Sequence, residues 1–150
     1  MAHLGRHAVV IGASMSGLLA ARALVDHYDQ VTLIDRDALP LACEPRKGVA
    51  QGRHTHGLLA RGREVLEHLF PGLTAGMIAK GAVPADLADE ILWYNHGFYL
   101  SNGPSGLSGL AVSRPMLEVE VRRRVLQFPN VQIRQRSDVV GLGRAATELM

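Results

Sequence analysis

Short apolar runs alternate with helical patterns along the first part of the chain. His7 to Ile11 and Gln30 to Ile34 are short runs rich in β-branched residues, which is typical of buried parallel strands. Between them, Leu18 to Val25 is rich in Ala and Leu and predicts a helix. The order strand, turn, helix, strand therefore predicts the first half of a βαβ unit in an α/β fold.

Two later segments also predict helices. Apolar residues recur at helical spacing from Leu58 to Phe70, and Pro71-Gly72 follows as a stop signal. Ser113 is a candidate N-cap for a second helix that runs to Phe128, with a proline in its first turn. We expect the three consecutive arginines at 122–124 to form a solvated face of this helix.

The remaining apolar segments predict strands. Residues 91–94 and 98–100 predict a hairpin around the Asn95-His96-Gly97 turn, and they hold four of the chain's seven aromatic residues. This hairpin is either a wall for an apolar substrate or ordinary packing, and its sequence favours neither. Residues 131–134 and 138–142 predict one strand or two that return to the sheet.

The turn between the first strand and the first helix carries the candidate chemistry. Gly12 permits a tight turn, position 14 must let the backbone approach a pyrophosphate, and Gly17 lets the helix pack closely on the strand. Amides at a helix N-terminus hold phosphates. Asp35 lies 23 positions after Gly12, close to the spacing of an acid that accepts from ribose hydroxyls. The pattern predicts a dinucleotide site.

Ser14 departs from the glycine of this fingerprint. Its hydroxyl could donate to a phosphate, although a serine narrows the allowed backbone angles. A glycine-rich turn that binds no nucleotide is the structural alternative. Asp35 repels a 2′-phosphate and argues against NADP, while Arg36 beside it weakens that argument. NAD and FAD share an adenosine diphosphate half, so the turn does not separate them.

The basic, turn-rich segment 38–57 has two interpretations. It is a solvated surface loop, or Arg53 and its neighbours face the cofactor; the residues alone favour the loop, because surface cations are common. His54 and His56 form a His-x-His pair that could ligate a metal. No third ligand is apparent, so the sequence predicts no metal site.

Composition narrows the class of protein. Of 150 residues, 47% are hydrophobic and 20% charged, which is typical of one globular domain and not of disorder. A net charge of +2 gives no case for nucleic-acid binding, and the single Cys43 excludes a disulfide framework. Residues 8–21 imitate a signal peptide, but polar residues and Arg22 interrupt the run, so no membrane span and a cytoplasmic protein are expected.

Three segments of the chain occur together in an informative order: residues 12–22, 48–59 and 113–118. The set resembles the start of FAD-dependent monooxygenases of the p-hydroxybenzoate hydroxylase and squalene epoxidase type, most of all bacterial flavin epoxidases that act on polyether precursors. The first motif is shared with many nucleotide-binding proteins, and the other two are more specific. The resemblance covers about residues 7–142.

The resemblance implies a fold and an activity. The fold is a Rossmann-like FAD-binding α/β fold with a parallel sheet and the start of an antiparallel substrate sheet. About 7–72 and 113–142 would form the nucleotide-binding portion, and about 73–112 would begin the substrate-sheet insertion. The activity is oxygen insertion into an apolar small molecule, with FAD as cofactor, O₂ as oxidant and NAD(P)H as reductant.

The resemblance also implies cofactor-binding residues, and FAD rather than NAD. Arg53 would lie near the flavin or its ribityl chain, Arg114 would reach the FAD, and the backbone around Val139 would flank the adenine. No catalytic side chain is implied, because the flavin carries the chemistry. The full set, with the pyrophosphate and ribose contacts described above, is Gly12, Ser14, Gly17, Asp35, Arg36, Arg53, Arg114 and Val139.

Members of this family are longer and carry a later Gly-Asp segment that is absent after Leu142. We therefore expect a fragment, a truncated reading frame or half of a split enzyme that is not catalytic alone. An incomplete sheet would leave an unpaired edge through which chains could associate. The alternatives are a non-catalytic nucleotide-binding module and a non-functional remnant.

Overall fold

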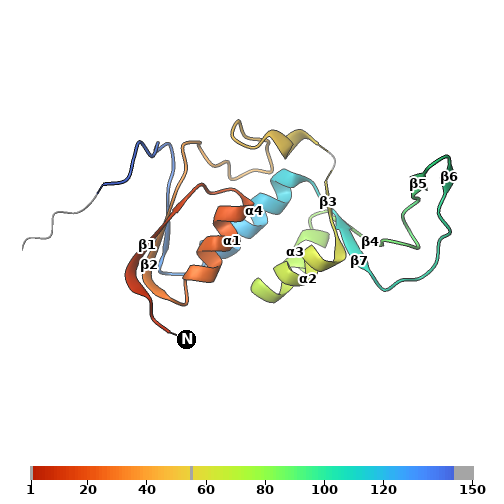
Figure 1. Cartoon of the computed structure of the whole chain (residues 1–150), viewed down its shortest axis with the longest axis horizontal. Helices are drawn as coiled ribbons and strands as arrows, with labels where there is room; N and C mark the ends of the chain where they lie inside the picture. Colours follow the sequence, from red (N-terminus) through yellow and green to blue (C-terminus); the bar gives the residue numbers. More distant parts are fainter. Residues whose placement is uncertain (1, 55, 144–150) are drawn as a thin grey trace, which may run out of the picture.

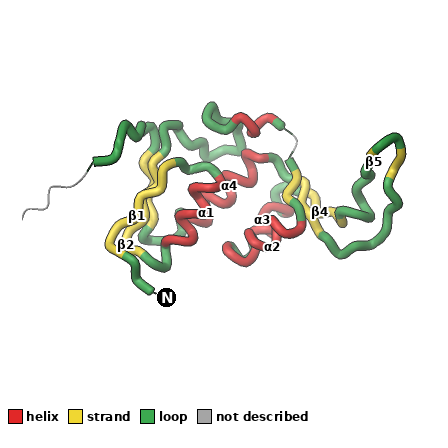
Figure 2. The backbone as a smooth tube through the Cα atoms, in the orientation of Figure 1, coloured by secondary structure: helices red, strands yellow, loops and turns green. Residues whose placement is uncertain are grey.

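The computed structural model describes residues 2–54 and 56–143 (Figures 1 and 2). It is a mixed α/β fold with one parallel and one antiparallel three-stranded sheet in this part of the chain, which confirms the predicted fold class at that level. The elements in chain order are β1 (Gly5–Ile11), α1 (Met15–Leu24), β2 (Tyr28–Ile34), η1 (Ala50–Arg53), β3 (Gly57–Leu58), α2 (Ala60–Leu69), α3 (Leu73–Ile78), β4 (Val83–Asp86), β5 (Tyr94–Asn95), β6 (Phe98–Tyr99), β7 (Ser108–Ala111), α4 (Arg114–Val125) and β8 (Val131–Arg134).

The parallel sheet has the strand order β1-β2-β8. Val10 of β1 and Ile133 of β8 lie opposite Leu33 of the central strand, one on each side. Val31 and Leu33 are fully buried on the face of the sheet that they share. Val9 and Ile11 of β1 point to the opposite face and are 53% and 64% exposed, so the prediction of a buried first strand is wrong at these two positions. Helix α1 connects β1 to β2, so the predicted strand, helix and strand are confirmed, with the helix beginning at Met15 rather than Leu18.

The antiparallel sheet has the order β3-β7-β4, and helix α2 packs against β7. The hairpin β5–β6 is confirmed but is shorter than predicted, and its turn places His96 and Gly97 at positive φ. Its rings Tyr94 and Tyr99 meet edge to face at 5.1 Å and remain exposed. In Figure 1 this hairpin extends from the end of the molecule opposite β1 and β2.

Helix α4 lies between the two halves of the molecule and contacts α1, α3 and η1. Ser113 caps it by accepting a hydrogen bond from the Met116 amide at 3.3 Å, as predicted, but the helix ends at Val125 rather than Phe128. The predicted solvated arginine face is wrong at Arg122, which is 5% exposed. That guanidinium is buried because it donates to the Pro40 carbonyl oxygen and forms an ion pair within the helix.

The predicted strand at residues 138–142 is wrong. After β8 the chain turns at Arg136, whose φ is 52°, and the Arg136 and Ser137 amides donate to the carbonyl oxygens of Asp37 and Asp35. The segment is thereby drawn toward the end of β2 instead of the sheet edge, and its Val140 is fully exposed. In the described ranges, no helix has both the length and the apolar character needed to cross a membrane.

Candidate functional site

A cavity of about 400 Å³ opens at the carboxyl ends of β1 and β2. In open α/β sheets, ligands bind outside the carboxyl ends of the strands. The start of α1, the segment between β2 and η1 (the connection, residues 35–49) and the segment after β8 complete its walls. The lining residues are Ile11, Gly12, Ser14, Ile34, Asp35, Arg36, Asp37, Arg46, Gly48, Ser137, Asp138 and Val139.

The glycine turn has the two properties that a phosphate site requires. Gly12 has φ +95°, a region that L side chains avoid, and no atom lies within 4 Å of where its Cβ would stand. A Cβ on Gly17 would instead overlap the Gly12 carbonyl group, so a side chain there would push α1 off β1. Gly12 thus leaves the turn open toward the cavity, and Gly17 lets α1 pack directly against the backbone of the turn.

Asp35 joins the end of β2 to this turn. Its Oδ2 accepts a 2.7 Å hydrogen bond from the Ala13 amide, and its Oδ1 accepts one of 2.9 Å from the Asp37 amide. The side chain is 7% exposed and lines the cavity. A carboxylate has about four lone-pair positions, so Asp35 keeps acceptor capacity for a ligand hydroxyl beside these backbone donors.

Arg46 of the connection is the main site residue that the sequence did not reveal. Its side chain is 8% exposed and contacts three carboxylates: Nε lies 2.7 Å from Glu118, and Nη1 lies 2.9 Å from Asp37 and 3.4 Å from Asp35. Burial acts to lower the pKa of Arg46, but hydrogen bonding and attraction from Glu118, and then Asp35, outweigh burial and raise it. The surface-loop interpretation of this segment is wrong at Arg46.

Ser14 fits its position without strain. It is the N-cap residue of α1 with φ −84° and ψ −176°, which is ordinary extended backbone, so no glycine is needed here. Its hydroxyl donates to Oε2 of Glu118 at 3.2 Å and accepts from Nη2 of Arg114 at 3.4 Å. The hydroxyl therefore faces α4, and its proton is used by Glu118 in place of the predicted phosphate.

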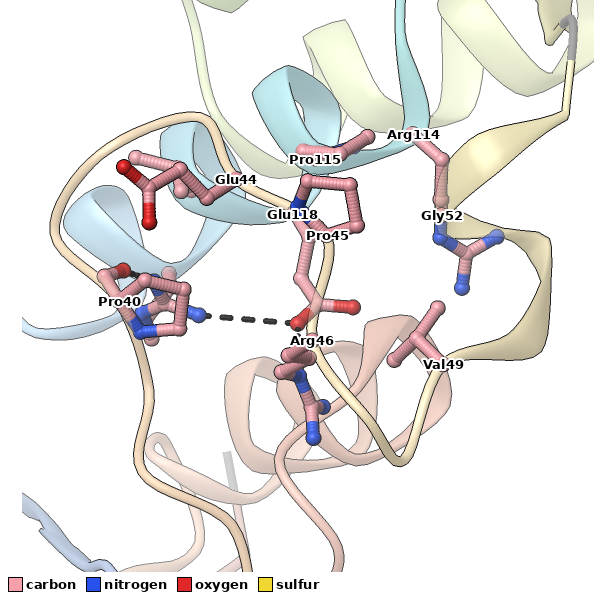
Figure 3. Close-up of a pocket in the computed structure, with 11 residues that line it drawn as sticks. Pro40, Glu44, Pro45, Arg46, Val49, Gly52, Arg114, Pro115 and Glu118 are labelled. Carbon is pink, nitrogen blue, oxygen red and sulfur yellow. Dashed lines mark hydrogen bonds and ion pairs between the residues drawn. The ribbon is translucent and has the colours of Figure 1, made fainter.

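Two buried guanidinium nitrogens lack a hydrogen-bond partner among the described residues: Nη2 of Arg46 and Nε of Arg114. Figure 3 shows both side chains around the Glu118 carboxylate, between the connection and α4. Buried polar groups in folded proteins are almost always paired, and an unpaired donor costs about 1–3 kcal/mol. Unpaired N–H groups on two cations beside an open glycine turn fit an anionic ligand.

The structure brings most of the predicted site residues together. Gly12, Ser14, Asp35, Arg36 and Val139 line the cavity, while Gly17 and Arg114 contact residues of the turn. Arg53 is exposed at the end of η1 and lines a neighbouring depression that it shares with Arg46. No ion pair joins Arg53 to the turn within the described residues.

His54 and His56 line a second cavity of about 390 Å³ at the start of α4. Burial, and then the neighbouring charge of Arg114, lower the pKa of His56. Among the residues that the structure describes, no group of three or more His, Cys, Asp or Glu side chains is placed to hold a metal ion.

No protein-family model matches this chain. Protein Rv3254 of Mycobacterium tuberculosis is 45% identical to it over 134 residues, which are 87% of this chain and 28% of that protein. The chain thus spans a little over a quarter of the curated relative that it matches.

Solved structures share the fold. A probable FAD-dependent monooxygenase, PqsL of Pseudomonas aeruginosa, matches 95% of this chain with 36% of its own, at a TM-score of 0.66 and 16% identity. The tetrameric form of 2-methyl-3-hydroxypyridine-5-carboxylic acid oxygenase matches 91% of this chain with 33% of its own, at a TM-score of 0.64 and 25% identity. The predicted likeness to flavin monooxygenases is therefore confirmed at the level of the fold.

Proposed function

We propose that this chain binds FAD as the nucleotide-binding part of a flavin-dependent monooxygenase. One observation carries the proposal: an open glycine turn, the Asp35 carboxylate and the Arg46 guanidinium, which has one unpaired nitrogen, line the cavity at the end of β1. Arg114, which also has an unpaired nitrogen, contacts Ser14 of the same turn. The fold shared with PqsL, which is described as FAD-dependent, supports FAD over NAD.

Each wall of the cavity suits a different part of the cofactor. The turn amides at the start of α1, together with Arg46 and Arg114, would hold the diphosphate, because these groups are donors or cations. Asp35 would accept from the adenosine ribose, since its carboxylate favours hydroxyl donors and repels phosphate. Arg36 and Val139 line the side where the adenosine would lie.

Arg53 has a separate assignment. Its exposed guanidinium lies at the end of η1, beyond the cavity in which the diphosphate and ribose are placed. We assign it to the flavin or ribityl end of the cofactor, as the sequence resemblance implies.

The activity class follows from the cofactor. FAD, when bound, supplies the redox and oxygen chemistry, while the protein binds, orients and excludes water. NAD(P)H is the proposed reductant, and the proposed substrate is an apolar molecule that receives one oxygen atom, by epoxidation or by hydroxylation. Because the chain spans 28% of Protein Rv3254 and 36% of PqsL, FAD binding is the part of this activity that its own residues carry.

An apolar cavity of about 170 Å³ supports the substrate proposal. It lies against the antiparallel sheet and is lined by aliphatic side chains and Trp93, whose indole N–H already donates to the Leu87 carbonyl oxygen. A lining with so few free polar groups suits the hydrocarbon part of a ligand.

A non-catalytic nucleotide-binding module is the second candidate. The contacts around Gly12 and Asp35 concern a diphosphate and a ribose, which ADP, NAD and FAD share. This candidate predicts that the three ligands bind with similar affinity.

Titration of the purified chain with FAD, NAD and ADP separates the two functions. We expect saturable FAD binding, with a shifted flavin absorption spectrum and at least about tenfold tighter binding than NAD or ADP. Equal binding of the three would favour the module, and colourless protein that takes up no added FAD would exclude the proposed function.

A further inference from the structure

Glu118 is a buried carboxylate at the centre of the contacts behind the glycine turn. It lies in the second turn of α4, and its side chain is 6% exposed. Oε1 accepts from Nε of Arg46 at 2.7 Å and lies 3.6 Å from Nη1 of Arg122. Oε2 accepts from the Ser14 hydroxyl at 3.2 Å. One side chain thus contacts the turn, the connection and its own helix.

These contacts fix the orientation of two residues that line the cavity, Ser14 and Arg46. Because the Ser14 proton goes to Glu118, the Ser14 oxygen is left to accept from Arg114. Because Nε of Arg46 is held by Glu118 and Nη1 by Asp35 and Asp37, the remaining nitrogen of that guanidinium is the one without a partner.

Arg122 extends the same contacts to the start of the connection. It forms the ion pair with Glu118 and donates to the Pro40 carbonyl oxygen. Pro40 and Arg46 both belong to the connection, so α4 holds this segment at two points around the water-sized cavity of about 10 Å³ shown in Figure 3. In this way Glu118 couples α4 to the position of the connection.

We propose that Glu118 is a positioning residue for cofactor binding, acting through Ser14, Arg46 and Arg114 without touching the cofactor. The inference rests on the proposed FAD site. It also explains the serine at position 14, where the fingerprint has glycine: the hydroxyl is the link between the turn and α4. A glycine there would leave Oε2 of Glu118 and Nη2 of Arg114 without this shared partner.

The same helix supplies a matched control. Glu120 is 8% exposed and is paired with two cations, Lys80 at 2.6 Å and Arg123 at 2.7 Å. Neither cation belongs to the turn or the connection, and Arg123 reaches the connection only at the Leu41 carbonyl oxygen, at 3.4 Å, outside residues 44–49. Loss of charge at Glu120 therefore measures the effect of removing a buried, paired carboxylate from α4 without removing a direct contact to the turn.

The test compares Glu118→Gln, Ser14→Ala, their double variant and Glu120→Gln in the full chain. Arg46 and Ser14 donate to different oxygens of Glu118, and glutamine replaces one of these oxygens by an NH2 group, so one of the two donors would lose its acceptor. We expect the Kd for FAD, from quenching of flavin fluorescence, to rise about tenfold in Glu118→Gln and in Ser14→Ala. The double variant should add less than about twofold to either, and Glu120→Gln should stay within about twofold of wild type.

A second readout needs no cofactor. Amide hydrogen exchange in residues 44–49 of the ligand-free chain should be faster in Glu118→Gln than in wild type and unchanged in Glu120→Gln.

If Glu118→Gln and Glu120→Gln have the same Kd and the same exchange, or if Ser14→Ala and Glu118→Gln weaken binding additively, Glu118 has no positioning role. If Glu118→Gln does not fold, Ser14→Ala decides the question. A tenfold loss of FAD affinity in Ser14→Ala would support the positioning role of Glu118, and an affinity equal to that of wild type would overturn it. Absence of FAD binding by wild type overturns the proposed function itself, and exchange then decides whether Glu118 holds the connection.

Discussion

The Ala13 amide donates a 2.7 Å hydrogen bond to Oδ2 of Asp35, across 22 positions of sequence. The contact joins the turn after β1 to the end of the neighbouring parallel strand β2. Asp35, which the sequence predicts as an acceptor for ribose hydroxyls, thus also fixes the shape of the glycine turn. Cofactor affinity and fold stability should therefore change together at this carboxylate.

Asp35→Asn tests this double role. An amide offers one acceptor oxygen, so either the Ala13 or the Asp37 amide loses its partner and Arg46 loses part of its counter-charge. We expect the free energy of unfolding to fall by about 1–3 kcal/mol, measured by urea denaturation, and FAD binding to weaken. Asp29→Asn, at an acid of β2 that is 61% exposed, should change both by little. Equal effects of the two substitutions would show that the Asp35 contacts are energetically neutral.

Gly17→Ala should be strongly destabilising. The added Cβ overlaps the Gly12 carbonyl group, which is backbone and cannot rotate away, so α1 must move off β1. A loss of about 3 kcal/mol is expected from thermal or urea unfolding. Gly76→Ala is the control within a helix: its Cβ would stand 3.8 Å from the nearest atom, a nitrogen of Arg124, and should stabilise the chain by about 0.5–1 kcal/mol. Tolerance of alanine at position 17 would refute close packing of α1 on the turn.

Gly12→Ala should separate backbone strain from ligand contact. Gly12 and Gly97 have φ of +95° and +90°, and no atom lies within 4 Å of either hypothetical Cβ. Alanine should therefore cost a similar 1–2 kcal/mol, roughly, at each position. Only Gly12 borders the cavity, so only Gly12→Ala should weaken FAD binding. Equal FAD affinity in the two variants would remove the turn from the binding site.

Elements with a strong local pattern were predictable from the sequence. The two strands and the helix around Gly12 and Gly17 follow from β-branched runs, an Ala- and Leu-rich stretch and a glycine turn, which are short-range signals. The Asp35 position follows from spacing. Residues 138–142 have an apolar pattern but no strand, because the turn at Arg136 directs the chain to the end of β2.

The buried ion pairs could not be derived in the same way. Arg46 and Glu118 are 72 positions apart, and each alone has the character of a surface residue. One signal was present: apolar and charged residues alternate from Leu117 to Arg122 in α4, so the helix has no clean polar face, and Glu118 and Arg122 stand four positions apart. A helix with this pattern either exposes apolar side chains or buries charges in pairs. The partner from the connection becomes known only in three dimensions.

The hydrogen bonds of Asp86 to the segment before β7 predict that the stability of the chain depends on pH. Hydrogen bonds from the Ser105 hydroxyl and then from backbone amides, including those of Ala88 and Gly106, hold the pKa of Asp86 well below its ordinary value of 3.8. A lowered pKa in the folded state stabilises the fold above the unfolded-state pKa, and this contribution is lost as the pH falls further. Melting temperature should therefore drop below about pH 4. In Asp86→Asn the melting temperature should be lower at pH 6 and the difference from wild type should shrink in acid. A difference that stays constant from pH 6 to pH 3 would argue against the Asp86 contacts.

Backbone amide shifts of the isotope-labelled chain, followed by NMR during titration with FAD, report directly on the phosphate turn. The amides of Ala13, Ser14 and Met15 should show the largest saturable shifts, with weaker changes at Arg36 and Val139 on the adenosine side. If FAD binds with its largest shifts around Leu58 and Leu110 in the antiparallel sheet, and the turn amides do not respond, then the turn after β1 does not hold the diphosphate.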